Sequence, residues 1–169
     1  MTGSDTASAP SGHNARRAAR LAAVQAIYQM ELTGLDAEEV IEQFVAHRFT
    51  RAVEIPAGPP DEEFFGAIVR GVPHHQAEID RAVARALASG WTLERIDSIL
   101  RAILRAAAFE LIARRDVPAR VVIDQYLDIA HAFFEGDEPG FVNAVLDRLA
   151  RQKRAAEFGE TPGDGERQV

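Results

Sequence analysis

Three side chains in the second half of the chain have the types and the spacing of a metal site. Asp124, Asp128 and His131 are separated by four and then three residues, so on a helix they share one face. Two carboxylates and an imidazole can bind a divalent cation. A solvated helix face explains the same pattern, and no further ligand or nucleophile with a neighbouring base is recognisable. We favour the solvated face and predict neither a metal nor another cofactor.

A second pattern, near the N-terminus, has the chemistry of phosphate binding. Arg16, Arg17 and Arg20 precede any acidic residue until Glu31, in a chain whose formal net charge is −7 at pH 7. Positive charge concentrated at one helix start can bind a nucleic-acid backbone that the rest of the surface would repel. Arginine is also a good helix former that mostly lies on solvated faces. The cluster alone therefore leaves both interpretations open.

No common catalytic motif occurs in the chain. The sequence has no GxxxxGK[ST] phosphate loop, no GxGxxG, HExxH or GxSxG pattern, and no cysteine. These absences remove the usual nucleotide-dependent, zinc, serine-hydrolase and cysteine-nucleophile chemistries. We therefore predict that the protein is not an enzyme.

The elements that position these side chains are helices. Apolar residues recur in three- and four-residue steps with no sustained alternation, which predicts an all-α fold. The first helix is expected from an Asn14 N-cap to Gly34, and the second from an Asp36 N-cap with Glu39 completing a capping box. Later apolar segments predict further helices over 64–69, 79–87, 96–112, 121–134 and 139–149, of which 96–112 should be the most buried.

Composition also divides the chain. Prolines and a glycine mark Thr50–Pro60 as the long connector. We predict a flexible arm over 1–14, a helical domain over 15–155 with subdomains of about 15–90 and 91–155, and a polar tail over 156–169. The start of the chain lacks a secretory pattern, and charges interrupt every apolar run short of the roughly 18 residues of a membrane span. These features favour a cytoplasmic protein.

Aromatic residues flank a turn late in the chain. Phe133, Phe134 and Phe141 surround the segment Gly136–Gly140, where an exposed ring can stack on a nucleic-acid base. Core packing is the default for two of the three rings. Asn143 follows in the last helix, where it either satisfies backbone amides or hydrogen-bonds a ligand.

Three ordered blocks of the sequence resemble the NusB family of transcription antitermination factors. The blocks are Ala15–Tyr28, Arg101–Leu111 followed by Asp116–Pro118, and Phe141–Asp147. The resemblance covers about Ala15 to Leu149. It implies a NusB-like fold of two packed helical subdomains, with about three and then four helices.

The resemblance also implies a function. Members of the family bind the boxA RNA element of ribosomal-RNA leaders jointly with NusE, a small-subunit ribosomal protein, in a complex that keeps RNA polymerase from terminating early. No catalysis is implied. The RNA-binding residues that the resemblance implies are Arg16, Arg17, Arg20, Phe133, Asp137, Phe141 and Asn143. Because these residues are far apart in sequence, the hypothesis requires the first and last helices to be neighbours.

The partner surface departs from the family pattern. Tyr28 matches a residue of the NusE-facing side, and Arg101 belongs to the second matching block. Leu100 stands where an acidic residue often contributes to the NusE contact, so either the partner has changed to match or Asp97, one helical turn away, takes over that role. Asp124-Gln125 replaces an Asn-Glu pair, and His131 replaces a lysine, which alters the polarity there. A helical protein-binding adaptor without RNA readout is the alternative function, and homodimer formation stays open.

Overall fold

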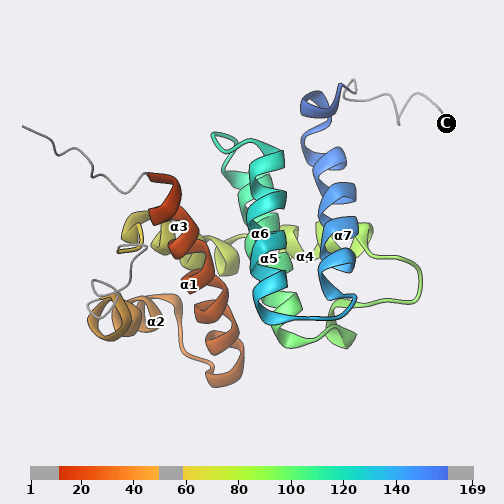
Figure 1. Cartoon of the computed structure of the whole chain (residues 1–169). Helices are drawn as coiled ribbons and strands as arrows, with labels where there is room; N and C mark the ends of the chain where they lie inside the picture. The colour runs from red at the N-terminus through yellow and green to blue at the C-terminus, as the bar shows by residue number, and fades with distance from the viewer. Residues whose placement is uncertain (1–11, 50–58, 160–169) are drawn as a thin grey trace, which may run out of the picture. The chain divides into compact units, whose positions relative to one another are not determined.

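The computed structural model describes residues 12–49 and 59–159 of the chain. These residues form seven α-helices and no β-strand, which confirms the all-α prediction (Figure 1). The chain divides into two compact units, Met1–His74 and His75–Val169. Each unit has its own buried core, and the units are described in turn.

The first unit contains three α-helices. They are α1 (Gly12–Thr33), α2 (Ala37–Gln43), which continues into a π-helical segment, η2 (Phe44–Phe49), and α3 (Glu62–His74). Helix α1 packs against α3, and α2 packs against both. The core includes an aromatic cluster in which Phe65 lies 5.4 Å from Phe44 and 4.9 Å from Phe49, measured between ring centroids. Apolar side chains of α1 cover the same core.

The helix ends of this unit follow the predicted chemistry with one exception. Asp36 Oδ1 accepts a hydrogen bond from Glu39 N at 2.9 Å, and Glu39 Oε1 accepts one from Asp36 N, so the predicted capping box is confirmed. Gly34, with φ of 77°, ends α1 as predicted. The prediction of Asn14 as N-cap was wrong, because α1 begins at Gly12. The alanines and arginines that follow are strong helix formers and sustain the first turn without that cap.

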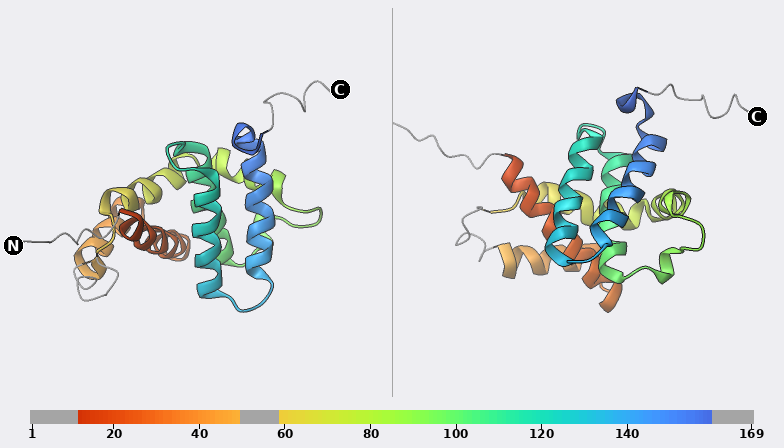
Figure 2. Two further views of the ribbon diagram at one scale, coloured as in Figure 1. Left: turned by 45° about the horizontal axis from the view of Figure 1, so that its top comes forward. Right: turned by 45° about the vertical axis from the view of Figure 1, so that its right-hand side comes forward.

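The second unit contains four α-helices: α4 (Gln76–Ala86), α5 (Ser98–Ala113), α6 (Ala119–Phe133) and α7 (Glu138–Lys153). Short 3₁₀ segments, η4 (Leu93–Arg95) and η5 (Ala155–Phe158), precede α5 and follow α7. Helices α5, α6 and α7 run side by side, and α4 packs against α5 and α7 (Figure 2). Ten of the sixteen residues of α5 are buried, more than in any other helix of this unit, which confirms the prediction that this segment is the most buried.

Two polar arrangements fasten α5 to its neighbours. Glu110 is fully buried and its Oε2 accepts a hydrogen bond from the Tyr126 hydroxyl at 2.5 Å. Arg105 Nε donates to Asp80 Oδ1 at 3.0 Å, so α5 is paired with α4. Both contacts join different helices, which gives these buried or half-buried polar groups partners.

A buried arginine, Arg154, closes the far end of this unit. The residue is 3% exposed, and its guanidinium donates to the backbone oxygens of Glu110, Leu111, Arg114 and Val117 at 2.8–3.1 Å. The same guanidinium donates to Glu157 Oε2 at 2.6 Å. Arg154 thus supplies donors to carbonyls at the end of α5 and just beyond it, where backbone donors within the helix run out, and it joins the end of α7 to the end of α5.

Glu157 belongs to the same network. Its Oε1 accepts a hydrogen bond from Ala119 N at 2.8 Å, at the first residue of α6. That backbone hydrogen bond, followed by the hydrogen bond from Arg154, lowers the pKa of Glu157 below its ordinary value. Both contacts favour the ionised carboxylate.

Several predicted boundaries change. The two units divide between His74 and His75 instead of near residue 90, because α4 packs on α5 and α7. Helix α4 ends at Ala86, close to the predicted end at residue 87, and α5 begins at Ser98 after its N-cap Asp97. The predicted arm, connector and tail lie mostly outside the described residues, although 12–14 belong to α1 and 155–158 form η5. Within 12–49 and 59–159, no helix is long and apolar enough to cross a membrane.

Candidate nucleic-acid interface

The arginines at the start of α1 converge on one aromatic ring of α3. The guanidinium carbon of Arg16 lies 4.5 Å from the centroid of the Phe64 ring, and that of Arg20 lies 4.9 Å from it. A guanidinium over an aromatic face within about 6 Å is attracted by the ring quadrupole. The sequence spacing of four residues places both arginines on the same side of α1, which is the side that packs on α3.

The three arginines differ in their exposure. Arg17 is exposed and Arg16 is half-buried, whereas Arg20 is only 2% exposed. Two guanidiniums of the cluster can therefore meet a large solvent-borne ligand directly. Arg20 is enclosed by the unit and contributes its charge from beneath the surface.

Asp61 adds a carboxylate to this cluster. Its Oδ2 lies 4.0 Å from Arg16 Nε, with both side chains about a third exposed, at 37% for Arg16 and 33% for Asp61. Its Oδ1 accepts a hydrogen bond from Phe64 N at 2.9 Å, and its own amide donates to Ala15 O at 3.0 Å. Asp61 thus caps α3 and joins the beginning of α3 to the beginning of α1.

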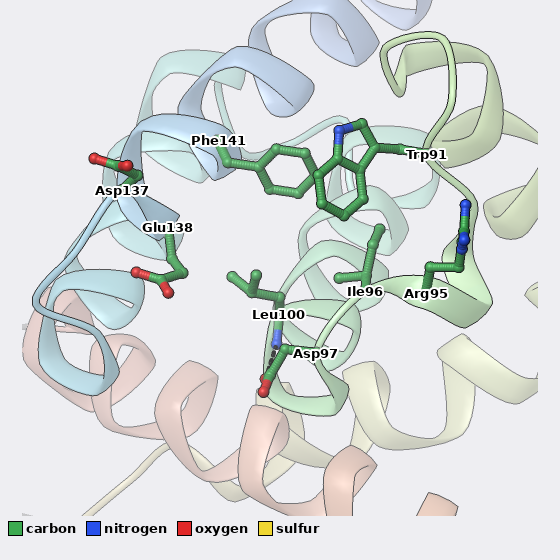
Figure 3. Close-up of a pocket in the computed structure, with 8 residues that line it drawn as sticks. All are labelled: Trp91, Arg95, Ile96, Asp97, Leu100, Asp137, Glu138 and Phe141. Carbon is green, nitrogen blue, oxygen red and sulfur yellow. Dashed lines mark hydrogen bonds between the residues drawn. The ribbon is translucent and has the colours of Figure 1, made fainter.

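The second unit contains a pocket with an aromatic wall and acidic side chains. Its volume is ≈ 400 Å³. Trp91 and Phe141 lie beside each other with ring centroids 5.8 Å apart, and Trp91 is 52% exposed (Figure 3). The residues that line the pocket are Trp91, Arg95, Ile96, Asp97, Leu100, Asp137, Glu138 and Phe141.

The pocket brings together residues that the sequence had assigned to two different ligands. Asp137 and Phe141 were predicted to bind RNA, and Asp97 and Leu100 to bind the partner protein. Asp97 also has a structural role, because its Oδ1 accepts hydrogen bonds from Ile99 N at 2.8 Å and Leu100 N at 3.3 Å, which caps α5. With three carboxylates and one arginine, the lining is suited to groups that donate hydrogen bonds and poorly suited to a phosphate.

The remaining predicted RNA-binding residues lie near this pocket in the sequence but do not line it. Phe133 is the last residue of α6 and is 37% exposed. Asn143 is exposed on α7. Both side chains are accessible to a ligand, on the helices that flank the turn leading into Asp137.

Two predicted partner residues have different surroundings. Tyr28 is half-buried on α1, in the first unit. Arg101 Nη1 donates to the backbone oxygens of Leu93 at 2.9 Å and Ile96 at 2.8 Å. The guanidinium of Arg101 is therefore engaged in holding the segment that follows Trp91.

The acidic and imidazole face of α6 does not form a metal centre in the described part of the chain. Asp124, Asp128 and His131 are all exposed, and no group of three or more potential ligands in residues 12–49 and 59–159 is placed to hold a metal ion. Gln125, between them, is buried instead, and its Oε1 accepts no hydrogen bond there. The departure at position 125 thus alters the interior of the unit.

The sequence interpretation missed Phe64, Asp61, Trp91 and Glu138. The sequence did contain a signal for the packing of Arg20 against Phe64. Arg20 precedes the buried residues Ala23, Val24 and Ile27 by three, four and seven positions. That spacing places Arg20 on the buried stripe of α1. No comparable local signal pairs Trp91 with Phe141, which are distant in sequence.

The fold and the two sites define a class of protein. The protein is all-α. Its first unit has an arginine-rich edge, and its second unit has an aromatic, acid-lined pocket, which together are typical of a binding protein.

The chain belongs to the NusB family, whose model matches residues 17–151. It is 56% identical to transcription antitermination protein NusB of Maricaulis maris over 144 residues, which is 85% of this chain and 90% of that protein. It is 54% identical to the protein of the same name from Caulobacter vibrioides over 82% of this chain and 94% of the relative.

Solved structures have the same fold. A T. maritima NusB structure is similar with a TM-score of 0.71 and 29% identity, and the match covers 85% of this chain and 96% of that one. A structure of antitermination factors NusB and NusE in complex with dsRNA matches with a TM-score of 0.67 and 22% identity, covering 80% of this chain and 96% of that one. At that identity the second likeness concerns the fold.

Proposed function

We propose that this chain is an RNA-binding transcription antitermination factor that acts in the cytoplasm without catalysing a reaction. Its RNA ligand is the boxA element of ribosomal-RNA leaders, bound together with NusE as part of the RNA polymerase antitermination complex. The family and the names of the relatives support the antitermination role. The observation that carries RNA binding is the accessible pair Arg16 and Arg17 at the start of α1, in a chain of net charge −7.

In this proposal the arginines anchor phosphates. Arg16 and Arg17 neutralise two phosphates, which corresponds to a salt slope of about −1.4, at roughly −0.7 for each phosphate of a single strand. The burial of Arg20 argues for two direct contacts instead of three. Such a shallow slope, with a net-negative protein, means that RNA affinity without the partner is modest. A basic partner protein adds positive field and contact area.

The second unit selects the bases. Single-stranded RNA is read by splayed bases that stack on aromatic rings and hydrogen-bond through their edges. Trp91 and Phe141 provide the rings, and Asp137 and Glu138 provide acceptors for exocyclic amino groups of a base. Phe133 and Asn143, exposed on the flanking helices, extend this patch. Phosphate contacts then position the RNA while the pocket specifies it.

The proposed NusE-facing residues are Tyr28, Asp97, Leu100 and Arg101. Leu100 is 7% exposed, so it supports the surface more than it contacts a partner. Arg101 acts through the backbone that it holds at Leu93 and Ile96. Tyr28 and Asp97 are the direct contacts in this proposal.

The double variant Arg16→Ala/Arg17→Ala tests the proposal. We expect its affinity for single-stranded boxA RNA to fall about tenfold or more, while helical circular dichroism and Tm stay near wild type, because half-exposed arginines contribute little to folding. The matched control is Arg81→Ala/Arg85→Ala, which removes the same charge from exposed positions of α4. Wild-type RNA affinity in the first variant would refute the proposal.

Filter binding separates this function from that of a protein-binding adaptor. Retention of boxA RNA and of a scrambled RNA is measured with and without NusE. We expect boxA retention to exceed scrambled retention and to increase with NusE. Equal, negligible retention in all four cases would favour the adaptor.

A further inference from the structure

We propose that Phe64 and Asp61, at the start of α3, are positioning residues for RNA binding. The ring of Phe64 holds the Arg16 guanidinium in place, and the Asp61 carboxylate pairs with that guanidinium until an RNA phosphate displaces the carboxylate. This inference rests on the proposed function and deepens it. It concerns the first unit alone and uses only its described contacts.

The ring is the fixed part of the arrangement. Phe64 is 2% exposed, and both Arg16 and Arg20 lie over it, at 4.5 Å and 4.9 Å from its centroid. Two guanidiniums held close together repel each other, and the negative face of the ring offsets part of that repulsion. A long side chain such as arginine otherwise loses considerable rotamer freedom when it is fixed by a ligand. By holding Arg16 beforehand, the ring reduces that loss when RNA binds.

The carboxylate is the exchangeable part. At 4.0 Å, with both side chains about a third exposed, the Arg16–Asp61 pair is a loose surface ion pair that water and salt weaken. A phosphate can accept shorter, charge-assisted hydrogen bonds from the same guanidinium. Asp61 also keeps a second task, because its Oδ1 caps α3 through Phe64 N. The Asp61 carboxylate therefore stays close to Arg16 after a phosphate has replaced it there, and it repels that phosphate.

The positions of the two residues are coupled through the backbone. The Asp61 amide donates to Ala15 O at 3.0 Å, one residue before Arg16. This hydrogen bond fixes the start of α3 to the start of α1, so the ring, the carboxylate and the guanidinium keep their register. Phe64 and Asp61 therefore act on RNA through Arg16, without touching the RNA themselves.

The experiment compares Phe64→Leu with the matched control Phe65→Leu. Phe65 is the neighbouring residue, is fully buried, and packs on Phe44 and Phe49. Dissociation constants for single-stranded boxA RNA are measured at several salt concentrations beside urea unfolding. We expect Phe64→Leu to weaken binding roughly threefold to tenfold, as for the loss of one cation–π contact, and to make the salt slope shallower by about 0.7. Phe65→Leu should lower stability and leave both quantities unchanged.

Two further variants complete the test. Phe64→Tyr keeps an aromatic face and should retain wild-type affinity and slope. Asp61→Asn preserves capping, because asparagine caps as well as aspartate, and should tighten binding about twofold to fivefold through the loss of one nearby negative charge.

Each outcome has a defined meaning. Equal RNA affinities for Phe64→Leu and Phe65→Leu overturn the assignment of Phe64, and an unchanged or weaker affinity for Asp61→Asn overturns that of Asp61. In either case the proposed function stands if Arg16→Ala/Arg17→Ala still loses RNA binding. If that double variant binds RNA like the wild type, the proposed function itself fails.

Discussion

Among residues 12–49 and 59–159, each unit buries one arginine, and the two are held in different ways. Arg154 of the second unit, 3% exposed, donates to four backbone carbonyls and to Glu157. Arg20 of the first unit, 2% exposed, lies over the Phe64 ring next to Arg16. Burial of a charge is costly unless the charge is paired and hydrogen-bonded.

The difference indicates what each arginine does. Arg154 is surrounded by hydrogen-bond acceptors, four of them backbone oxygens and the fifth the Glu157 carboxylate, so its charge serves the junction of α5, α6 and α7. Arg20 lies over the Phe64 ring beside Arg16, in a cluster that also contains the Asp61 carboxylate, and its charge adds to the potential where Arg16 and Arg17 reach the surface. We infer that Arg154 serves mainly stability and that Arg20 serves mainly the electrostatics of the interface.

The largest expected effect is that of Arg154→Ala. This change removes five hydrogen bonds, four of them to backbone oxygens and one to Glu157, which should lower the free energy of unfolding by about 3–5 kcal/mol. Because a typical domain is stable by only about 5–15 kcal/mol, the variant should be close to unfolding at 37 °C. Urea unfolding monitored by circular dichroism measures the loss.

Arg151→Ala is the control for that measurement. Arg151 is 47% exposed and pairs with Asp147 on the same helix at 3.1 Å, so its loss should cost less than about 1 kcal/mol. If the two variants were equally stable, the network around Arg154 would not stabilise the junction, and the comparison of the two arginines would fail.

A smaller, pH-dependent effect is expected for Glu157→Gln. Glutamine can still accept from Ala119 N but carries no charge for Arg154. Because the folded-state pKa of Glu157 is lowered, its ionised form stabilises the protein above its unfolded-state pKa of about 4.3, and this stabilisation disappears as the pH falls through the folded pKa. Since the side chain is 39% exposed, we expect less than about 1 kcal/mol at pH 7.

The measurement is Tm as a function of pH. The Tm of the wild type should exceed that of Glu157→Gln between about pH 5 and 8, and the two curves should converge as the pH falls through the lowered pKa of Glu157. A constant difference across that whole range would mean that the carboxylate charge is not what stabilises the junction.

The smallest expected effect is that of Arg20→Met on the salt slope of RNA binding. Because Arg20 is buried, its replacement by an apolar side chain of similar length should leave the slope within about 0.2 of wild type, although affinity falls modestly with the lost potential. Arg16→Met should make the slope shallower by about 0.7. A change of about 0.7 for Arg20→Met would instead place its guanidinium on a phosphate.

Local patterns in the sequence were sufficient to predict the fold class and several helix ends. Asp36 with Glu39, and Gly34 in a left-handed conformation, are short-range signals, because capping depends on residues within one turn. The boundary between the units was misplaced because Gly90 is a conspicuous breaker, whereas the packing of α4 on α5 and α7 depends on long-range contacts.

The sites were predictable to different degrees. The arginine cluster was evident, and even the burial of Arg20 follows from its spacing to Ala23, Val24 and Ile27. The Trp91–Phe141 contact and the role of Arg154 were not predictable, since each joins residues far apart in the sequence. Tertiary packing decides such contacts.

The two hydrogen bonds that Arg101 donates to Leu93 and Ile96 have a consequence for binding thermodynamics. They anchor the wall of the pocket to α5, so that wall should be ordered before any ligand arrives. Binding to such a preorganised wall loses less conformational entropy than binding that must first order a loop. The amides of residues 91–96 should accordingly exchange hydrogen slowly in the free protein, with little further protection when the pocket is filled.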